Sequence, residues 1–310
     1  MPTPVLKTNP KPPINAIHAV TDNPTLAELL RAATARLLPS RTYTPRLDAE
    51  VLLRHVLGID RTELFARLQE PVDPSVKSQF ERLIDRRLEG CPVAYMTGER
   101  EFMGFSFIVN PSVLIPRPGT EQLVEWAKLW LTSRPHAEVV DVGTGSGAII
   151  LSLAKIAKSW KGRAIGIDLS EAALNVARAN SSRLGLEDRV EFIAGDLLEP
   201  ITNPVELILA NLPYLTPAQI MENPELKAEP RIALDGGPDG LAEVRRLIDD
   251  IPRVLKPHGA VVLELDPNHA VEAVSIVHDR ITDSRTRVVR DLEDRDRFVI
   301  VERDNKKAML

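Results

Sequence analysis

Hydrophobic positions recur at helical spacing along the first 92 residues of the chain. The apolar residues of segment 26–37 follow one another at intervals of three and four, which predicts an amphipathic helix that Asn23 or Thr25 is suited to cap. Three further segments show the same kind of pattern: 45–58, 60–68 and 73–90. Because the connections between them are short, residues 23–92 are predicted to form a small N-terminal helical domain.

The pattern changes from helical spacing to alternation in the segment 93–116. Phe105, Phe107 and Val109 alternate with small or polar residues, and two glycines interrupt the run. Alternation with period two is typical of a half-buried strand. The segment is therefore predicted to be a β-hairpin that joins two domains.

From residue 117 to residue 303, short apolar runs alternate with helical patterns. The predicted strands are 137–143, 163–169, 190–196, 205–214 and 259–265, with two more near 285–290 and 297–302. The predicted helices are 148–159, 171–185, 240–255 and about 268–282. Continuous apolar strands separated by helices indicate an α/β domain whose seven-stranded sheet is mostly parallel and covered on both faces.

Composition adds an expectation about the cell compartment. The chain is 44% hydrophobic and 27% charged, as in ordinary soluble globular proteins, and its single cysteine, Cys91, suits a reducing cytoplasm. No segment has the roughly 20 consecutive apolar residues that a membrane-spanning helix needs. The proline-rich residues 1–22 are predicted to be a flexible leader.

The distribution of charge argues weakly against a nucleic-acid substrate. The net charge is −5: residues 23–92 carry 11 Lys and Arg against 10 Asp and Glu, and residues 93–310 carry 26 against 33. Neither part has the strong basic excess of proteins that bind long nucleic acids.

A glycine-rich turn follows the first predicted strand of the sheet. Gly143, Gly145 and Gly147 allow the backbone to turn tightly and to approach a ligand closely. Asp168 ends the next strand, at a distance suited to accept hydrogen bonds from the two ribose hydroxyls of an adenosine. The spacing G-x-G-x-G differs from the G-x-G-x-x-G of dinucleotide-binding proteins, which disfavours an NAD enzyme.

With Asp141 before it, this turn resembles the first motif of S-adenosylmethionine-dependent methyltransferases. The resemblance implies that the turn, including Thr144 and Ser146, passes beside the methionine part of the cofactor. It also implies that Asp196 and Leu197, in the segment AGDLLEP, lie near the adenine. The alternative is an α/β protein whose tight turn binds nothing.

The fourth predicted strand of the sheet ends in Asn211, Leu212, Pro213 and Tyr214. In an open parallel sheet, ligands bind at the carboxyl ends of the strands, so Asn211 should lie beside the cofactor. The side-chain oxygen of Asn211 and the carbonyl of Leu212 are suited to hold the two N–H bonds of a planar amino group. Tyr214 can stack on that group, and Pro213 stiffens the turn.

This tetrapeptide resembles the N-P-P-Y or D-P-P-Y motif of methyltransferases that act on exocyclic or side-chain NH₂ groups. Leu212 stands where the motif has its first proline. The backbone acceptor is kept, but the turn is expected to be less rigidly locked.

Three further segments resemble the bacterial release factor glutamine methyltransferases: AYMTGEREF (94–102), LIPRPGTEQLVE (114–125) and EPRIALDGGPDGL (229–241). With them the resemblance covers roughly residues 20–303. It implies a class I methyltransferase fold and transfer of a methyl group from S-adenosylmethionine, with S-adenosylhomocysteine as product. The acceptor would be the glutamine of the Gly-Gly-Gln motif of peptide chain release factors, which the N-terminal domain would help to recognise.

The chain departs from this family after the fifth strand of the sheet. The family commonly has an E-x-G-x-x-Q pattern there, whereas this chain reads LELDPNHA, with Glu264 kept and Asp266 and His269 at the glycine and glutamine positions.

Other interpretations remain at this point. The acceptor could be a glutamine of a ribosomal protein or an adenine-N6 amino group of DNA or RNA, and a non-catalytic cofactor-binding scaffold is a third possibility. Arg117 is suited either to the cofactor carboxylate or to the inter-domain turn. Glu229 and Arg231 are expected to form a salt bridge that folds the 215–240 loop. The scattered histidines do not suggest a metal site.

Overall fold

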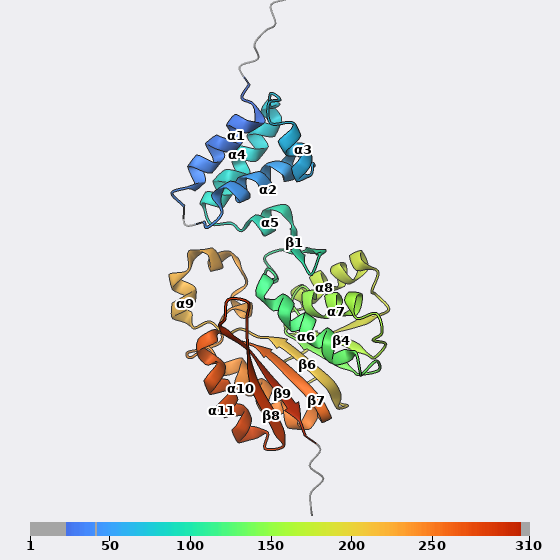
Figure 1. Ribbon diagram of the computed structural model, residues 1–310. Helices are drawn as coiled ribbons and strands as arrows, with labels where there is room; N and C mark the ends of the chain where they lie inside the picture. The colour runs from blue at the N-terminus through green and yellow to red at the C-terminus, as the bar shows by residue number, and fades with distance from the viewer. Residues whose placement is uncertain (1–22, 41, 305–310) are drawn as a thin grey trace, which may run out of the picture. The chain divides into compact units, whose positions relative to one another are not determined.

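The computed structural model describes residues 23–40 and 42–304, so the predicted leader at 1–22 lies outside the described residues (Figure 1). The chain divides into two compact units after Ile84, inside a helix, and each unit is described by itself. The domain boundary expected at residue 92 stays a prediction. No helix in the described residues is long and apolar enough to cross a membrane.

The first unit is helical. Its helices are α1 (Leu26–Leu37), α2 (Pro45–Leu57), α3 (Arg61–Ala66) and α4 (Pro74–Leu88), the last of which continues past the division. Thr25 caps α1 in a capping box with Glu28, which satisfies two backbone donors that the helix leaves free. The buried faces of α1, α2 and α4 carry the apolar residues that the sequence pattern marks, among them Leu29, Leu52 and Phe80.

The predicted hairpin is shorter than the sequence pattern suggested. Helix α5 (Val93–Thr97) takes the first part of the segment and ends at Gly98, and the hairpin consists of β1 (Glu99–Phe102) and β2 (Phe105–Ile108). Met103 and Gly104 both have positive φ angles, of 54° and 75°. Two such residues form the tight turn that matches the twist of an antiparallel strand pair.

The second unit is built on a seven-stranded sheet, which confirms the predicted fold class. Its strands are β3 (Val139–Val142), β4 (Ala164–Asp168), β5 (Val190–Ala194), β6 (Val205–Asn211), β7 (Leu255–Glu264), β8 (Ser284–Arg290) and β9 (Asp296–Arg303). Their order is β5-β4-β3-β6-β7-β9-β8, and β9 runs in the direction opposite to the other six strands.

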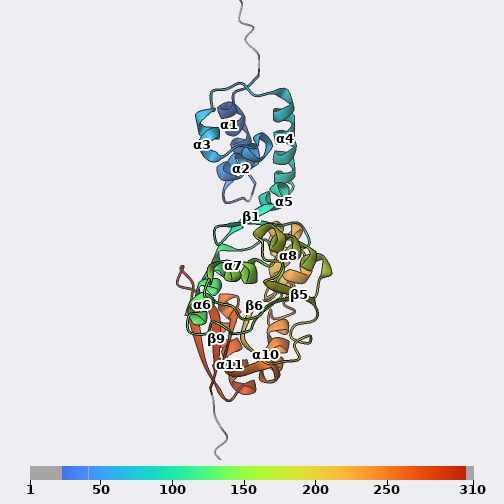
Figure 2. The same ribbon diagram turned by 90° about the vertical axis from the view of Figure 1, so that its right-hand side faces the viewer.

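Helices cover both faces of this sheet (Figures 1 and 2). Alternate residues of each strand point to opposite faces, so Val139 and Leu207 pack with α6 (Glu121–Leu131) and α7 (Ala148–Ile156). On the other face Val140 and Ile208 pack with α10 (Ala242–Val254) and α11 (Ala270–Arg280). Helix α8 (Glu171–Leu184) follows β4. The strand ends are thereby held rigidly at one edge of the sheet.

Besides α5, two further helices were not anticipated from the sequence. One is α6, although its apolar residues have helical spacing, and it begins directly after the short 3₁₀ turn η1 (Pro118–Thr120). The other is α9 (Pro217–Glu222), one turn capped by Thr216. The remaining 3₁₀ turns are η2 (Pro224–Ala228), η3 (Arg231–Ala233) and η4 (Pro267–His269).

Candidate active site

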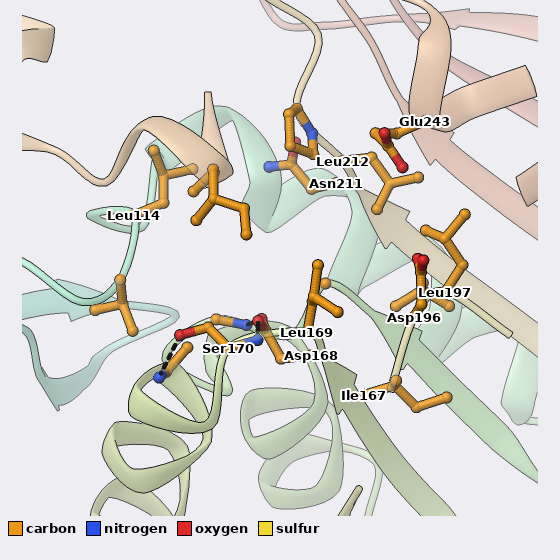
Figure 3. Close-up of a pocket in the computed structure, with 18 of the residues that line it drawn as sticks. Leu114, Ile167, Asp168, Leu169, Ser170, Asp196, Leu197, Asn211, Leu212 and Glu243 are labelled. Atoms are coloured by element: carbon orange, nitrogen blue, oxygen red, sulfur yellow. Dashed lines mark hydrogen bonds between the residues drawn. The ribbon is translucent and has the colours of Figure 1, made fainter. Parts of the chain in front are cut away.

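A cavity of about 390 Å³ opens at the carboxyl ends of β3, β4, β5 and β6 (Figure 3). The predicted site residues that line it are Gly143, Gly145, Asp168, Asp196, Leu197, Asn211, Leu212 and Pro213. They come from four different strand ends, which the parallel sheet brings to one edge. In Figure 3, Asn211 and Leu212 lie across the opening from Asp168 and Ser170.

Asp168 ties the glycine turn to the second strand. Its Oδ2 accepts a hydrogen bond from the backbone N–H of Gly145 at 2.8 Å, and its Oδ1 accepts one from Ser170 at 2.9 Å. Burial raises the pKa of this carboxyl, while the two backbone donors oppose the rise. Asp168 therefore holds the turn in place and still borders the cavity.

Thr144, Ser146 and Gly147 were also predicted to border the cofactor, but they do not line this cavity. They build the turn instead: Thr144 donates to Asp141 Oδ2 at 2.6 Å, and Asn180 donates to the carbonyl of Ser146 at 2.9 Å. A Cβ atom on Gly147 would lie 2.8 Å from Leu151 Cδ1. The three residues thus contact the protein interior and not the cavity.

Asp141 is a fully buried carboxyl beneath the turn. Burial raises its pKa to about 7, and the hydrogen bond from Thr144 opposes this rise. Its Oδ1 has no hydrogen-bond partner of standard geometry among the described residues, and the backbone N–H of Ile150 also opposes the rise in pKa. Below neutral pH this side chain is therefore largely uncharged.

Asp196 is bound by an arginine that the sequence did not point to. Arg246 Nη2 lies 2.6 Å from Asp196 Oδ2, and Arg246 also pairs with Glu243. All three side chains line the cavity. An exposed arginine on an amphipathic helix carries no distinguishing sequence signal, because most such residues only face solvent.

Asn211 is held by an element far away in the chain. Its Nδ2 donates to the hydroxyl of Thr120 at 3.2 Å, so the Oδ1 of the carboxamide is turned away from Thr120. Thr120 belongs to the segment LIPRPGTEQLVE, but no sequence pattern assigned it a role.

Leu212 packs against the glycine turn, and the expectation of a less rigid turn stays a prediction. Its side chain is buried in the core, and its Cδ2 lies 3.2 Å from the place where a Cβ on Gly143 would stand. The turn after β6 is thus fastened to the glycine turn by side-chain packing.

Tyr214 is not among the described residues that line the cavity. Its hydroxyl accepts a hydrogen bond from Arg297 Nη2 at 2.9 Å, and the guanidinium carbon lies 5.2 Å from the centroid of the ring. Burial raises the pKa of this phenol, and the charge of Arg297 opposes the rise. Arg297, on β9, was not anticipated from the sequence.

The expected salt bridge between Glu229 and Arg231 is wrong. Glu229 pairs with Arg117 and accepts the backbone N–H of Ile115 at 3.0 Å, whereas Arg231 pairs with Asp235 at 3.0 Å. Glu229 is buried and needs a cation and a donor, which the segment 115–117 supplies. The loops 112–117 and 229–235 are thereby joined and form one wall of the cavity.

A Rossmann-like sheet with a glycine turn, an acidic residue at the next strand end and an Asn-Leu-Pro-Tyr turn defines a class I methyltransferase. Residues 133–297 match the family model of a methyltransferase domain, and residues 28–98 match that of the PrmC N-terminal domain. The chain belongs to the release factor glutamine methyltransferase family.

The relatives that carry this assignment are similar over most of their length. The release factor glutamine methyltransferase of Moorella thermoacetica is 42% identical over 252 residues, covering 80% of this chain and 88% of that protein. The one of Deinococcus radiodurans is 38% identical over 275 residues, covering 88% and 97%. The hMettl16 catalytic domain matches the fold with a TM-score of 0.52 at 17% identity, over 68% of this chain and 80% of that one.

Proposed function

We propose that this protein methylates the side-chain amide nitrogen of the glutamine in the Gly-Gly-Gln motif of peptide chain release factors. The single observation that carries the proposal is the position of Asn211, at a strand end beside the glycine turn, with its Nδ2 bound to Thr120. This leaves the carbonyl oxygen of Asn211 to accept a hydrogen bond from an amide. The family membership supports a release factor as the protein that presents it, in the cytoplasm.

The cavity fits S-adenosylmethionine as methyl donor, with S-adenosylhomocysteine as product. Gly143 and Gly145 let the backbone approach the methionine part, and Asp168 borders the cavity where ribose hydroxyls need an acceptor. Asp196 and Leu197 border the part that suits an adenine. When bound, S-adenosylmethionine supplies a methyl group on a positively charged sulfur, which keeps the bonding electron pair as the methyl leaves.

The acceptor nitrogen is a poor nucleophile, because its lone pair is delocalised into the amide carbonyl. The oxygens of Asn211 and of the Leu212 backbone would accept its two N–H bonds, and Tyr214 would stack on the flat group. The lone pair would then form the new bond to the methyl carbon while the bond from that carbon to sulfur breaks, and the nitrogen would release one proton to solvent. Such fixed positioning can supply roughly 7–11 kcal/mol of the barrier in favourable cases.

The proposal is tested by methyl transfer from labelled S-adenosylmethionine. Four acceptors are offered in parallel: a release factor, the same factor with its Gly-Gly-Gln glutamine changed to alanine, a ribosomal fraction and duplex DNA. We expect label on the intact factor and none on the alanine version. Label on ribosomal protein or DNA would replace the substrate, and cofactor binding without any transfer would favour a scaffold.

Asn211→Ala should abolish transfer while leaving the cofactor bound. Loss of one positioned acceptor is expected to lower kcat by at least about 100-fold, and the affinity for S-adenosylhomocysteine should change by less than about threefold. The matched control is Asn175→Ala, at an exposed position of α8. Near-normal activity of the Asn211 variant would remove this residue from the mechanism.

A further inference from the structure

We propose that Thr120, Glu264 and Arg297 form a buried hydrogen-bonded chain that fixes the orientation of the Asn211 carboxamide and of Tyr214. The inference rests on the proposed function, because it gives these three side chains a positioning role toward the methyl acceptor. It also assigns a role to Glu264, the residue kept where the chain departs from the family pattern.

The sheet register brings the members of this chain together. Asn211 on β6 is the direct partner of Glu264 on β7, so both side chains point to the face that α6 covers. Thr120 lies immediately before α6 on the same face. On the other side of β7, Phe298 of β9 is the register partner of Glu264. Arg297 comes directly before Phe298 in the chain and therefore lies close to Glu264.

Glu264 is the centre of the arrangement. Its side chain is only 1% exposed, and its Oε1 accepts a hydrogen bond from Arg297 Nη2 at 2.7 Å. Burial raises the pKa of this carboxyl, and the positive charges of Arg297 and Arg117 oppose the rise. Arg297 is fixed in turn, because its Nη1 donates to the carbonyl of Leu265 at 3.0 Å.

The charge of Glu264 sets the direction of the hydrogen bonds. A carboxylate only accepts, and Oε2 has no partner of standard geometry among the described residues. We place the hydroxyl proton of Thr120 toward this unpartnered oxygen, because Glu264 is the register partner of Asn211, whose Nδ2 contacts Thr120. The oxygen of Thr120 must then accept from Asn211, as its 3.2 Å contact with Nδ2 indicates.

This direction matters because a carboxamide can present either end to a neutral hydroxyl. If Thr120 gave its proton to Asn211 instead, the carboxamide would turn over and present N–H groups to the acceptor amide. Two groups of donors would then face each other, and no hydrogen bond could form. The guanidinium of Arg297, which pairs with Glu264, also donates to the Tyr214 hydroxyl. One arginine therefore orients both the Glu264 carboxylate and the Tyr214 ring.

The test compares three threonine variants by kcat, KM for the release factor, the Kd of S-adenosylhomocysteine, and thermal unfolding. Thr120→Val keeps the shape and removes the hydroxyl, and we expect kcat to fall about 10- to 100-fold with KM and Kd within about threefold. Thr120→Ser restores the hydroxyl and should return kcat to within about threefold of the unchanged protein. Thr286→Val, the same change on β8 away from the site, should leave kcat, KM and Kd unchanged.

A Thr120→Val variant with kcat within about threefold of the unchanged protein would overturn the inference. So would a loss of kcat that thermal unfolding explains, or one that Thr120→Ser does not reverse. Glu264→Gln provides a second readout, because its amide can donate to Thr120 and allow the chain to reverse. The Glu264→Gln change should lower kcat without raising the Kd of S-adenosylhomocysteine.

The proposed function is tested separately, by which acceptor the unchanged protein labels. If the unchanged protein labels ribosomal protein or DNA in place of a release factor, the proposed substrate fails. The threonine comparison is then made on that acceptor, where the same pattern supports the positioning chain and its absence refutes it.

Discussion

Leu212 holds the turn after β6 by a different physical means than the proline of the related motif. A proline at this position would stiffen the turn through its ring, whereas Leu212 fastens the turn by burying its side chain against Gly143. The backbone carbonyl that is proposed to hold the acceptor amide belongs to the same residue. Packing at Leu212 should therefore influence both stability and catalysis.

Leu212→Ala is expected to lower the free energy of unfolding by about 2–5 kcal/mol, because it leaves a cavity in the core. It should also lower kcat about tenfold, since the carbonyl is no longer held firmly. Leu212→Met conserves the volume and serves as the control, with a cost under about 1.5 kcal/mol. Urea denaturation and steady-state kinetics measure the two effects, and equal behaviour of the two variants would contradict the packing argument.

Asp141 predicts a specific pH dependence of stability. Its pKa is 3.8 in a reference state and about 7 in the folded protein, so between these values the folded chain holds a proton that the unfolded chain has released. Its contribution to stability is fully present below about pH 4 and is lost as the pH rises through about 7.

Asp141→Asn removes this titration. The stability of the variant relative to the unchanged protein should rise with pH by up to about 1.4 kcal/mol per unit inside that window, and stay constant above about pH 8. Urea denaturation at pH 5, 6, 7 and 8 measures the difference, in which the contributions of other groups cancel. Parallel stability curves would show that Asp141 does not titrate there.

The sequence revealed those site residues that local signals mark. Asp168 and Asn211 end apolar runs, and the ends of parallel strands meet at one edge of the sheet. Thr120 and Arg297 could not be found in this way, because their contacts depend on register and on chain segments far apart. Period-two alternation would have placed Asn211 and Glu264 on one face once their pairing was known.

At the scale of elements, the order of strands and helices in the second unit follows from the hydrophobic pattern. Helix α6 was not predicted, although Leu123, Ala127 and Trp130 have helical spacing. The contacts of the loop 229–241 were beyond sequence reasoning, since charge alone does not say that Glu229 meets Arg117 in place of Arg231.

This loop lies against the backbone of the Asn-Leu-Pro-Tyr turn. Leu215 donates to the carbonyl of Leu234 at 3.0 Å, and Gly236 donates to the carbonyl of Leu215 at 2.8 Å. A Cβ on Gly236 would lie 2.6 Å from the carbonyl oxygen of Pro213, and one on Gly240 would overlap the carbonyl of Tyr214 and the ring of His269. The glycines therefore permit the close approach that supports Tyr214.

Gly240→Ala tests this support against a control with the same backbone angle. Gly240 and Gly98 have φ angles of 75° and 76°, but no described atom lies within 4 Å of a Cβ on Gly98. Gly98→Ala should cost about 1–2 kcal/mol from backbone strain alone. Gly240→Ala should cost more and should lower kcat by up to about 100-fold, because the Tyr214 backbone must move. Similar denaturation midpoints and similar kcat values for the two variants would contradict the close-approach argument.

At the scale of the whole molecule, the helical unit carries several exposed apolar side chains. Leu38, Tyr43, Leu47 and Phe65 are all exposed there, Tyr43 to 93%. Leu38 and Phe65 line the same surface cavity, and large apolar groups that share a surface site are typical of protein-binding sites. We propose that this unit binds the release factor while the second unit carries the chemistry.

The double change Tyr43→Ser and Leu47→Ser should raise KM for the release factor about tenfold, a loss of about 1.4 kcal/mol in binding. Because these residues belong to the helical unit, kcat and the affinity for S-adenosylhomocysteine should stay unchanged. Leu292→Ser, at a position of the second unit that is 91% exposed, is the control. An unchanged KM in the double variant would place recognition elsewhere.

The position of β9 in the sheet has a consequence for folding during synthesis on the ribosome. This strand is the last of the sheet to be synthesised, yet it lies between β7 and β8, and in the described chain β8 pairs with no other strand. A nascent chain that ends before β9 leaves β8 without hydrogen bonds and Glu264 without its arginine. Translation must therefore pass residue 297 before the acceptor side can assemble, and a prematurely terminated product would be inactive and prone to aggregate through its open sheet edge.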